Sequence, residues 1–103
     1  MAATLIAALP WYHRNDYPAL LKLFNDPDEQ GATYDLWLVH AEAIESQLRG
    51  AGFSVARIWI RPVPFAAWCK VRNVSPDQRA RVTFATEAAR ALRGARAIEG
   101  ERG

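Results

Sequence analysis

The sequence predicts a single α+β domain in which about four helices pack on one side of a short strand element, residues 53–61. Its 103 residues suffice for one hydrophobic core, and half of them are apolar. Most apolar residues recur with helical spacing, whereas those of one segment alternate as in a strand. We expect the domain to span residues 1–103, with a variable segment at 1–10 and a frayed tail at 94–103.

The first predicted helix follows two residues that can cap it. Asn15 and Asp16 can accept hydrogen bonds from the first turn, Pro18 is tolerated there, and the polar run 25–28 ends the helix. Its inner face comprises Tyr17, Leu20, Leu21 and Phe24.

The second predicted helix begins after Thr33 and ends near Gly50 and Gly52. Its apolar stripe comprises Trp37, Ala41, Ile44, Leu48 and Ala51. Glu45 and Arg49 are four residues apart, so we expect them to pair on the solvent side.

Residues 53–61 alternate in character, which predicts a strand with two different faces. Ala56, Ile58 and Ile60 form the face expected to lie under helices. The other face is expected to meet water or a partner, and it comprises Val55, Arg57, Trp59 and Arg61.

A strand without a neighbour would leave its backbone N–H and C=O groups unpaired. The strand can pair with Thr4–Leu9 at the N-terminus, or antiparallel with its copy in a second chain, giving a two-fold homodimer. The outer face with Trp59 slightly favours the dimer.

Two further helices are expected after the strand. The first starts at Pro62–Pro64, buries Phe65, Trp68 and Cys69, and breaks at Asn73–Val74. The last begins at Ser75–Gln78, where Ser75 and Gln78 have capping-box spacing and Pro76 takes the first helical position. Its inner face comprises Val82, Ala85, Ala88, Ala89 and Leu92, while Asp77 and Arg81 support its exposed side.

Charge is divided unevenly along the chain. Residues 1–50 carry three basic and seven acidic side chains, whereas residues 51–103 carry ten basic and four acidic ones. Such asymmetry indicates either an anionic partner or two halves whose opposite charges face each other inside the fold.

Composition also predicts a cytoplasmic protein without membrane contact. The sequence has no apolar stretch near the length of a membrane helix, and its first nine residues lack the features of a secretory signal. A single cysteine cannot form an internal disulfide, as is typical of a reducing compartment.

Four segments resemble those of a group of short, functionally uncharacterised bacterial proteins: Trp11–Tyr17, Thr33–Leu38, Phe65–Cys69 and Arg81–Glu87. The group reads W-Y-x-R-x-D-Y, T-Y-D-x-W, F-x-x-W-C and R-x-x-F-A-x-E, over about residues 11–91 of this chain. The resemblance implies a bacterial, cytoplasmic protein and no particular activity. Leu36 and Arg61-Pro62-Val63 depart from it, because the group has acidic residues at these places.

The candidate metal ligands lack the spacing of a metal site; they are His13, His40, Asp35, Glu42 and Glu45. Cys69 follows Trp68 on an inner helix face, so we expect a buried, inert thiol rather than a nucleophile. We therefore expect no catalytic residue, no metal and no cofactor.

The densest polar cluster of the sequence surrounds His13, Arg14, Asp16 and Tyr17. His13 could transfer a proton, Asp16 could orient it, and Arg14 could hold an anion, which makes these residues the candidates for a ligand site. The structural alternative, which we favour, places Tyr17 in the core, Asp16 at a helix cap and Arg14 beside an acid.

Residues 65–93 also have the proportions of a helix-turn-helix. Its candidate phosphate-binding residues are Arg72, Arg79, Arg81, Arg90 and Arg93. Arg79 at an expected core position and Asn73 in place of a turn glycine argue against nucleic-acid binding.

The sequence thus favours a small, non-enzymatic protein that acts through self-association or a protein partner. A homodimer formed through the 53–61 strand is the leading hypothesis, and a nucleic-acid binder using residues 65–93 is the alternative.

Overall fold

The computed structural model describes residues 5–26 and 33–102, with side chains through Leu92. It confirms an α+β fold with a small parallel sheet and a majority of helical residues. The elements are β1 (Ile6–Trp11), the 3-10 turn η1 (Arg14–Asp16), α1 (Tyr17–Leu23), α2 (Tyr34–Gly50), β2 (Ser54–Trp59), α3 (Pro62–Arg72) and α4 (Gln78–Arg102). Within the described ranges, no helix is long and apolar enough to cross a membrane.

The N-terminal segment pairs with the predicted strand within one chain. β1 runs parallel to β2, with Ile6 opposite Ser54 and Trp11 opposite Trp59. The sequence left two pairings open, and the structure shows the one between the N-terminal segment and the strand. The paired segment is 6–11 rather than 4–9, and Thr4 lies outside the described residues. Since β1 already pairs with β2, the dimer is not needed to supply the strand with a neighbour.

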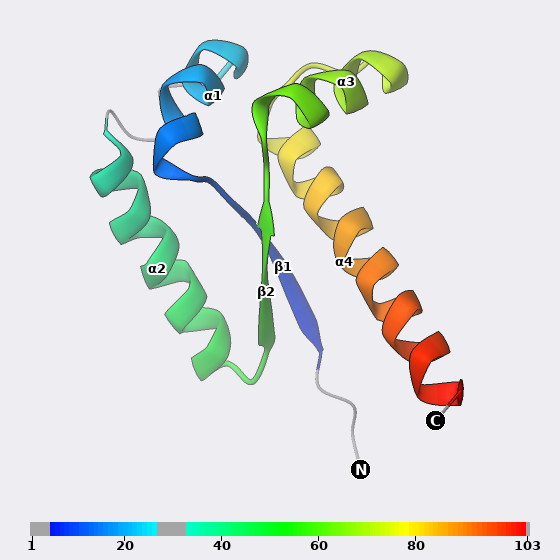
Figure 1. The fold of residues 1–103 in the computed structure, drawn as a ribbon. Coiled ribbons are helices and arrows are strands. Elements are labelled where there is room, and N and C mark those ends of the chain that lie inside the picture. Colours follow the sequence, from blue (N-terminus) through cyan, green and yellow to red (C-terminus); the bar gives the residue numbers. More distant parts are fainter. Residues whose placement is uncertain (1–4, 27–32, 103) are drawn as a thin grey trace.

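Helices cover both faces of this sheet, which corrects the expectation that all of them lie on one side (Figure 1). α4 packs on one face, where Ala85 and Ala89 contact Ile58. α2 packs on the opposite face, where its Glu45 binds Arg57. Side chains of a strand alternate between faces, so neighbours such as Arg57 and Ile58 meet different helices.

Each strand keeps one edge without a strand neighbour in the described part of the chain. The backbone N–H groups of Ser54 and Ile60 donate to the carbonyls of Leu5 and Trp11, at 2.9 and 2.8 Å. By the alternation of a parallel ladder, residues 54, 56, 58 and 60 turn their backbone groups toward β1, and residues 55, 57 and 59 turn theirs away. The same alternation places Pro10 on the open edge of β1, where its missing N–H breaks no ladder bond.

An aromatic core holds the first half of the chain against α3. Trp11 and Tyr12 pack on Trp37 of α2, with ring centroids 5.2 and 4.6 Å apart. Phe24 at the end of α1 meets Phe65 of α3 edge-to-face at 6.1 Å. Burial of such large rings is the main stabilising term available to a chain of this size.

The first two helices follow the predicted pattern with two corrections. Thr33 caps α2 by accepting a hydrogen bond from the Leu36 N–H, as predicted. Asp16 precedes α1 but makes no side-chain cap bond, because its carboxylate binds Arg61. In the stripe of α2, Ile44 is exposed while Glu45 is buried, because Glu45 turns toward Arg57 of the sheet.

The last two helices join at a residue in the left-handed conformation. Asn73 ends α3 with φ 56°, a conformation that asparagine tolerates better than most residues, so it takes the usual place of glycine. α4 begins two residues later than predicted, and Asp77 is its cap, accepting a hydrogen bond from the Ala80 N–H at 2.9 Å. Two residues predicted for its inner face, Val82 and Leu92, are exposed.

The backbone of α4 extends into the predicted tail segment. α4 continues through Arg102, past the point near Gly94 where fraying was expected.

Candidate functional site

The acidic first half and the basic second half face each other in the fold. Arg57 binds Glu45, Arg61 binds Asp16, and Arg81 binds Asp26. All three pairs join an arginine from the second half to an acid from the first. Three further pairs, Arg14–Asp35, Arg49–Glu45 and Arg72–Glu87, lie within one half. The two halves therefore compensate each other in part.

The pair on the sheet is built around a buried carboxylate. Glu45 accepts two hydrogen bonds from Arg57, at 2.7 and 2.8 Å, and Arg57 lies 3.9 Å above the ring of Trp11. The hydrogen bonds from Arg57 lower the pKa of Glu45, against the opposing effect of desolvation. Arg49, the predicted partner, is 3.6 Å away and contributes at longer range.

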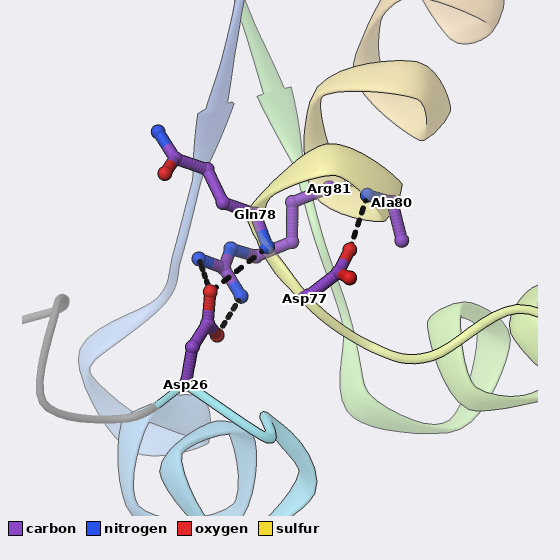
Figure 2. Close-up of polar contacts among 5 residues, drawn as sticks. All are labelled: Asp26, Asp77, Gln78, Ala80 and Arg81. Carbon is purple, nitrogen blue, oxygen red and sulfur yellow. Dashed lines mark hydrogen bonds and ion pairs between the residues drawn. The ribbon is translucent and has the colours of Figure 1, made fainter.

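The pair at the start of α4 joins this helix to the segment that follows α1 (Figure 2). Arg81 is 2% exposed and donates to both carboxylate oxygens of Asp26, at 2.8 and 3.3 Å. One of these oxygens also accepts from the Gln78 N–H, so Asp26 contributes to capping α4 from a distant part of the chain. Phe24 lies beneath the guanidinium, 4.3 Å from it.

Ionisation of the groups around Arg81 follows from these contacts. The hydrogen bonds from Arg81 hold the pKa of Asp26 below its ordinary value. Burial raises the pKa of Tyr12, although its hydrogen bond with Arg81 acts in the opposite direction. The sequence placed Arg81 on an exposed helix side, which is wrong because Asp26 is brought to it from α1.

The four candidate ligand residues of the first half do not converge on one site. Tyr17 is in the core, and His13 stacks on Trp59 with ring centroids 4.0 Å apart. Arg14 binds Asp35 at 2.7 Å on the surface, and Asp16 binds Arg61. These positions agree with the structural alternative for Arg14 and Tyr17, whereas the cap assigned there to Asp16 is wrong.

The predicted interface residues lie along β2 and just after it. Val55, Arg57 and Trp59 alternate onto the face that α2 covers, and Arg61 precedes α3. The Trp59 side chain is 44% exposed. Arg57 and Arg61 are held by acids of the same chain, so this edge presents an exposed indole and an open backbone rather than free charge.

A groove runs along the opposite edge of the sheet, beside β1. It has a volume of about 410 Å³ and lies between α2 and α4, with Trp37, Ile44, Gln78 and Val82 among its lining residues. The sequence predictions missed it because Ile44 and Val82 were assigned to buried faces. Pro10 could have indicated the groove, because a proline within a strand is typical of an edge that has no strand neighbour.

The remaining candidates from the sequence are a metal site and the thiol of Cys69. Among the described residues, no three His, Cys, Asp or Glu side chains are grouped so that they could hold a metal ion. Cys69 is buried as predicted, and desolvation raises its pKa, which lowers the fraction of reactive thiolate.

Two arginines of the helix-turn-helix alternative pair with acids of the same chain, Arg72 at the surface and Arg81 in the interior. Arg72 binds Glu87 through two hydrogen bonds of 2.6 Å and stacks on Trp68, and Arg81 is buried against Asp26. Arg79 and Arg90 are exposed. The arginines of this half therefore include internal partners of acids as well as surface charges.

Comparison of the chain with protein-family models, with curated proteins and with solved structures found no match.

Proposed function

We propose that this protein acts through self-association in the cytoplasm, without catalysis, by joining the open β2 edges of two copies. The single observation that carries the proposal is the edge itself. Its outward backbone groups belong to Val55, Arg57 and Trp59, none of which is a proline, and the indole of Trp59 is 44% exposed beside them.

A two-fold axis through Arg57 gives a favourable antiparallel register. It sets Val55 of one copy opposite Trp59 of the other, twice, and aromatic with β-branched residues are favourable cross-strand pairs. The two Arg57 side chains would then be opposite each other. Their repulsion is small because each guanidinium is bound to its own Glu45 at 2.7 and 2.8 Å.

The edge of β1 is less suited to strand pairing. Pro10 supplies no N–H there, whereas all three outward residues of β2 keep theirs. A two-stranded sheet is also small compared with the four to six strands that are most common, and joining two copies through β2 gives a sheet of that size.

Sedimentation equilibrium over the micromolar range tests this proposal. We expect a dimer for the native chain and a folded monomer for Val55→Pro, since the lost N–H points away from β1. Trp59→Lys should weaken the dimer as well, and Val63→Lys, which alters an exposed residue outside β2, should leave it intact. A native monomer throughout this range, or a dimer that Val55→Pro leaves intact, would refute the proposal.

The nucleic-acid alternative gives a different result with the same protein. Fluorescence anisotropy with a labelled DNA duplex at low salt would show binding that weakens steeply as salt is added. We expect no such binding, because Arg72 and Arg81 already bind Glu87 and Asp26. Salt-sensitive binding that is lost in Arg79→Ala would favour the alternative instead.

A further inference from the structure

His13 and Trp59 form a stacked pair beside the open edge of β2. Their rings are nearly parallel, with an interplanar angle of 9°, and the ring centroids are 4.0 Å apart. His13 is exposed, and Trp59 is 44% exposed with His13 against it. The pair therefore brings a titratable ring to the indole that the proposed self-association uses.

Backbone hydrogen bonds on both sides of His13 set its position. The carbonyl of Trp11 accepts from the Ile60 N–H at 2.8 Å, so the chain leaves β1 beside the end of β2. The carbonyl of His13 accepts from the Asp16 N–H at 3.1 Å, at the start of η1. These bonds hold the backbone of His13 next to Trp59.

The other charged groups around this pair are arginines that each have a carboxylate partner. They belong to η1, α2, β2 and the residue before α3, and the pairs are Arg14–Asp35, Arg57–Glu45 and Arg61–Asp16. At longer range, the Arg57–Glu45 pair is influenced by three groups of α2, which are Tyr34, Glu42 and Arg49. Histidine is the side chain that ordinarily changes its charge between pH 5 and 8. Protonation of His13 therefore adds positive charge to an edge whose arginines are already compensated.

This added charge should oppose the joining of two β2 edges. Joining removes water from Trp59 and from the ring stacked on it, and the loss of water costs more for an imidazolium than for a neutral imidazole. A two-fold axis also brings the same positive charge of both copies toward the shared interface. The attraction of an imidazolium to the indole face exists in the free chain and in the dimer alike, so it does not offset these costs.

We propose that His13 is a pH switch for self-association, in which the neutral imidazole allows two β2 edges to join and the imidazolium keeps them apart. The inference rests on the proposed function, because it describes how the same edge is regulated. The switch needs no rearrangement of the backbone, since it acts through the charge of one ring on Trp59.

Sedimentation equilibrium at pH 7.0 and pH 5.5, at equal ionic strength, tests the switch. We expect the dissociation constant of the native dimer to be at least fivefold higher at pH 5.5. His13→Phe keeps an aromatic ring against Trp59 without a titratable group, so it should dimerise equally at both pH values. The chain has two histidines, and His40 lines the groove beside β1. His40→Phe is therefore the matched control, and it should retain the native pH dependence.

The outcomes separate the switch from the self-association on which it rests. A native dimer that is equally strong at both pH values, or stronger at pH 5.5, would overturn the switch and leave the self-association intact. A pH dependence that persists in His13→Phe would also overturn the switch. A native chain that is monomeric at both pH values would refute the two proposals together.

The stack itself can be measured without the dimer. In the Val55→Pro variant, which we expect to be a folded monomer, the indole of Trp59 should shift the proton resonances of the His13 imidazole upfield in nuclear magnetic resonance spectra. Adding Trp59→Leu to that variant should remove the shift. Imidazole resonances that are the same with and without Trp59 would contradict the stacked geometry and overturn the switch.

Discussion

At the scale of single residues, two arginine–aspartate ion pairs of this fold contribute differently to its stability because their exposure differs. Arg14 and Asp35 are 61% and 74% exposed, whereas Arg81 and Asp26 are 2% and 20% exposed. An exposed pair is screened by water, and its charges lose little when they separate. A buried arginine without its carboxylate has no comparable substitute partner.

Substituting the acids of these two pairs should therefore give unequal losses of stability. We expect Asp26→Ala to lower the free energy of unfolding by about 2–4 kcal/mol, since it leaves Arg81 buried and unpaired. It also removes an acceptor from the Gln78 N–H. Asp35→Ala should cost less than about 1 kcal/mol. Urea denaturation followed by circular dichroism measures both, and equal losses would contradict the role assigned to Arg81.

Glu45 should make stability depend on acid pH. Hydrogen bonds from Arg57 lower its pKa in the folded state, so the folded chain binds fewer protons than the unfolded chain in acid. The stabilising contribution is complete above the unfolded carboxyl value of about 4.3 and is lost as the pH falls through the lower folded value. In urea denaturation from neutral to acid pH, Glu45→Gln should therefore show a shallower decline. An unchanged slope would contradict this assignment.

At the scale of secondary-structure elements, the capping signals of the sequence work only where no other partner competes. Thr33 caps α2 as predicted, and Gly52 takes the positive φ of 97° that follows the helix. Asp16 and Ser75 were expected to cap as well. Arg61 binds Asp16, and Asp77, two residues after Ser75, caps α4.

Completing the cap of α2 should stabilise the protein. Leu36 is 52% exposed and occupies the third helical position, where an acid would form a capping box with Thr33. We expect Leu36→Glu to raise the free energy of unfolding by about 0.5 kcal/mol. Thr33→Ala should lower it by about 1 kcal/mol. Thermal denaturation compares the two variants, and a loss of stability in Leu36→Glu would count against the cap geometry.

At the scale of the whole molecule, small side chains allow α4 to approach the sheet closely. Ala85 is fully buried, and with Ala89 it packs on Ile58, while Ala8 and Ala56 lie next to them. The close contact between α4 and the sheet leaves little space for a larger group. These alanines determine how α4 is placed beside both the groove and β1.

Enlarging one of these alanines should separate the layers. We expect Ala85→Leu to cost about 1–3 kcal/mol through overpacking, and to alter the width of the groove. Ala91→Leu, at an exposed position of the same helix, should change stability by less than about 0.5 kcal/mol. Chemical denaturation of both variants checks this, and a stable Ala85→Leu protein would contradict the close packing.

Much of the architecture could be predicted from local pattern alone. The helices α1 to α3, the strand at 53–61 and the caps at Thr33 and Gly52 depend on neighbours within a few residues. The candidate sites could not be predicted in this way. The burial of Arg81 depends on Asp26, 55 residues away, and the exposure of Ile44 depends on a groove between two helices that the sequence does not order in space.

The sequence by itself determined the fold class, most element boundaries and the charge imbalance between the two halves, because each of these is a property of local composition and spacing. Only the tertiary structure decided that the N-terminal segment pairs with the strand in parallel, that helices cover both faces, and which acid binds which arginine. These outcomes depend on the relative stability of contacts between distant segments. Periodicity carries no information about such contacts, since the same amphipathic pattern fits more than one neighbour.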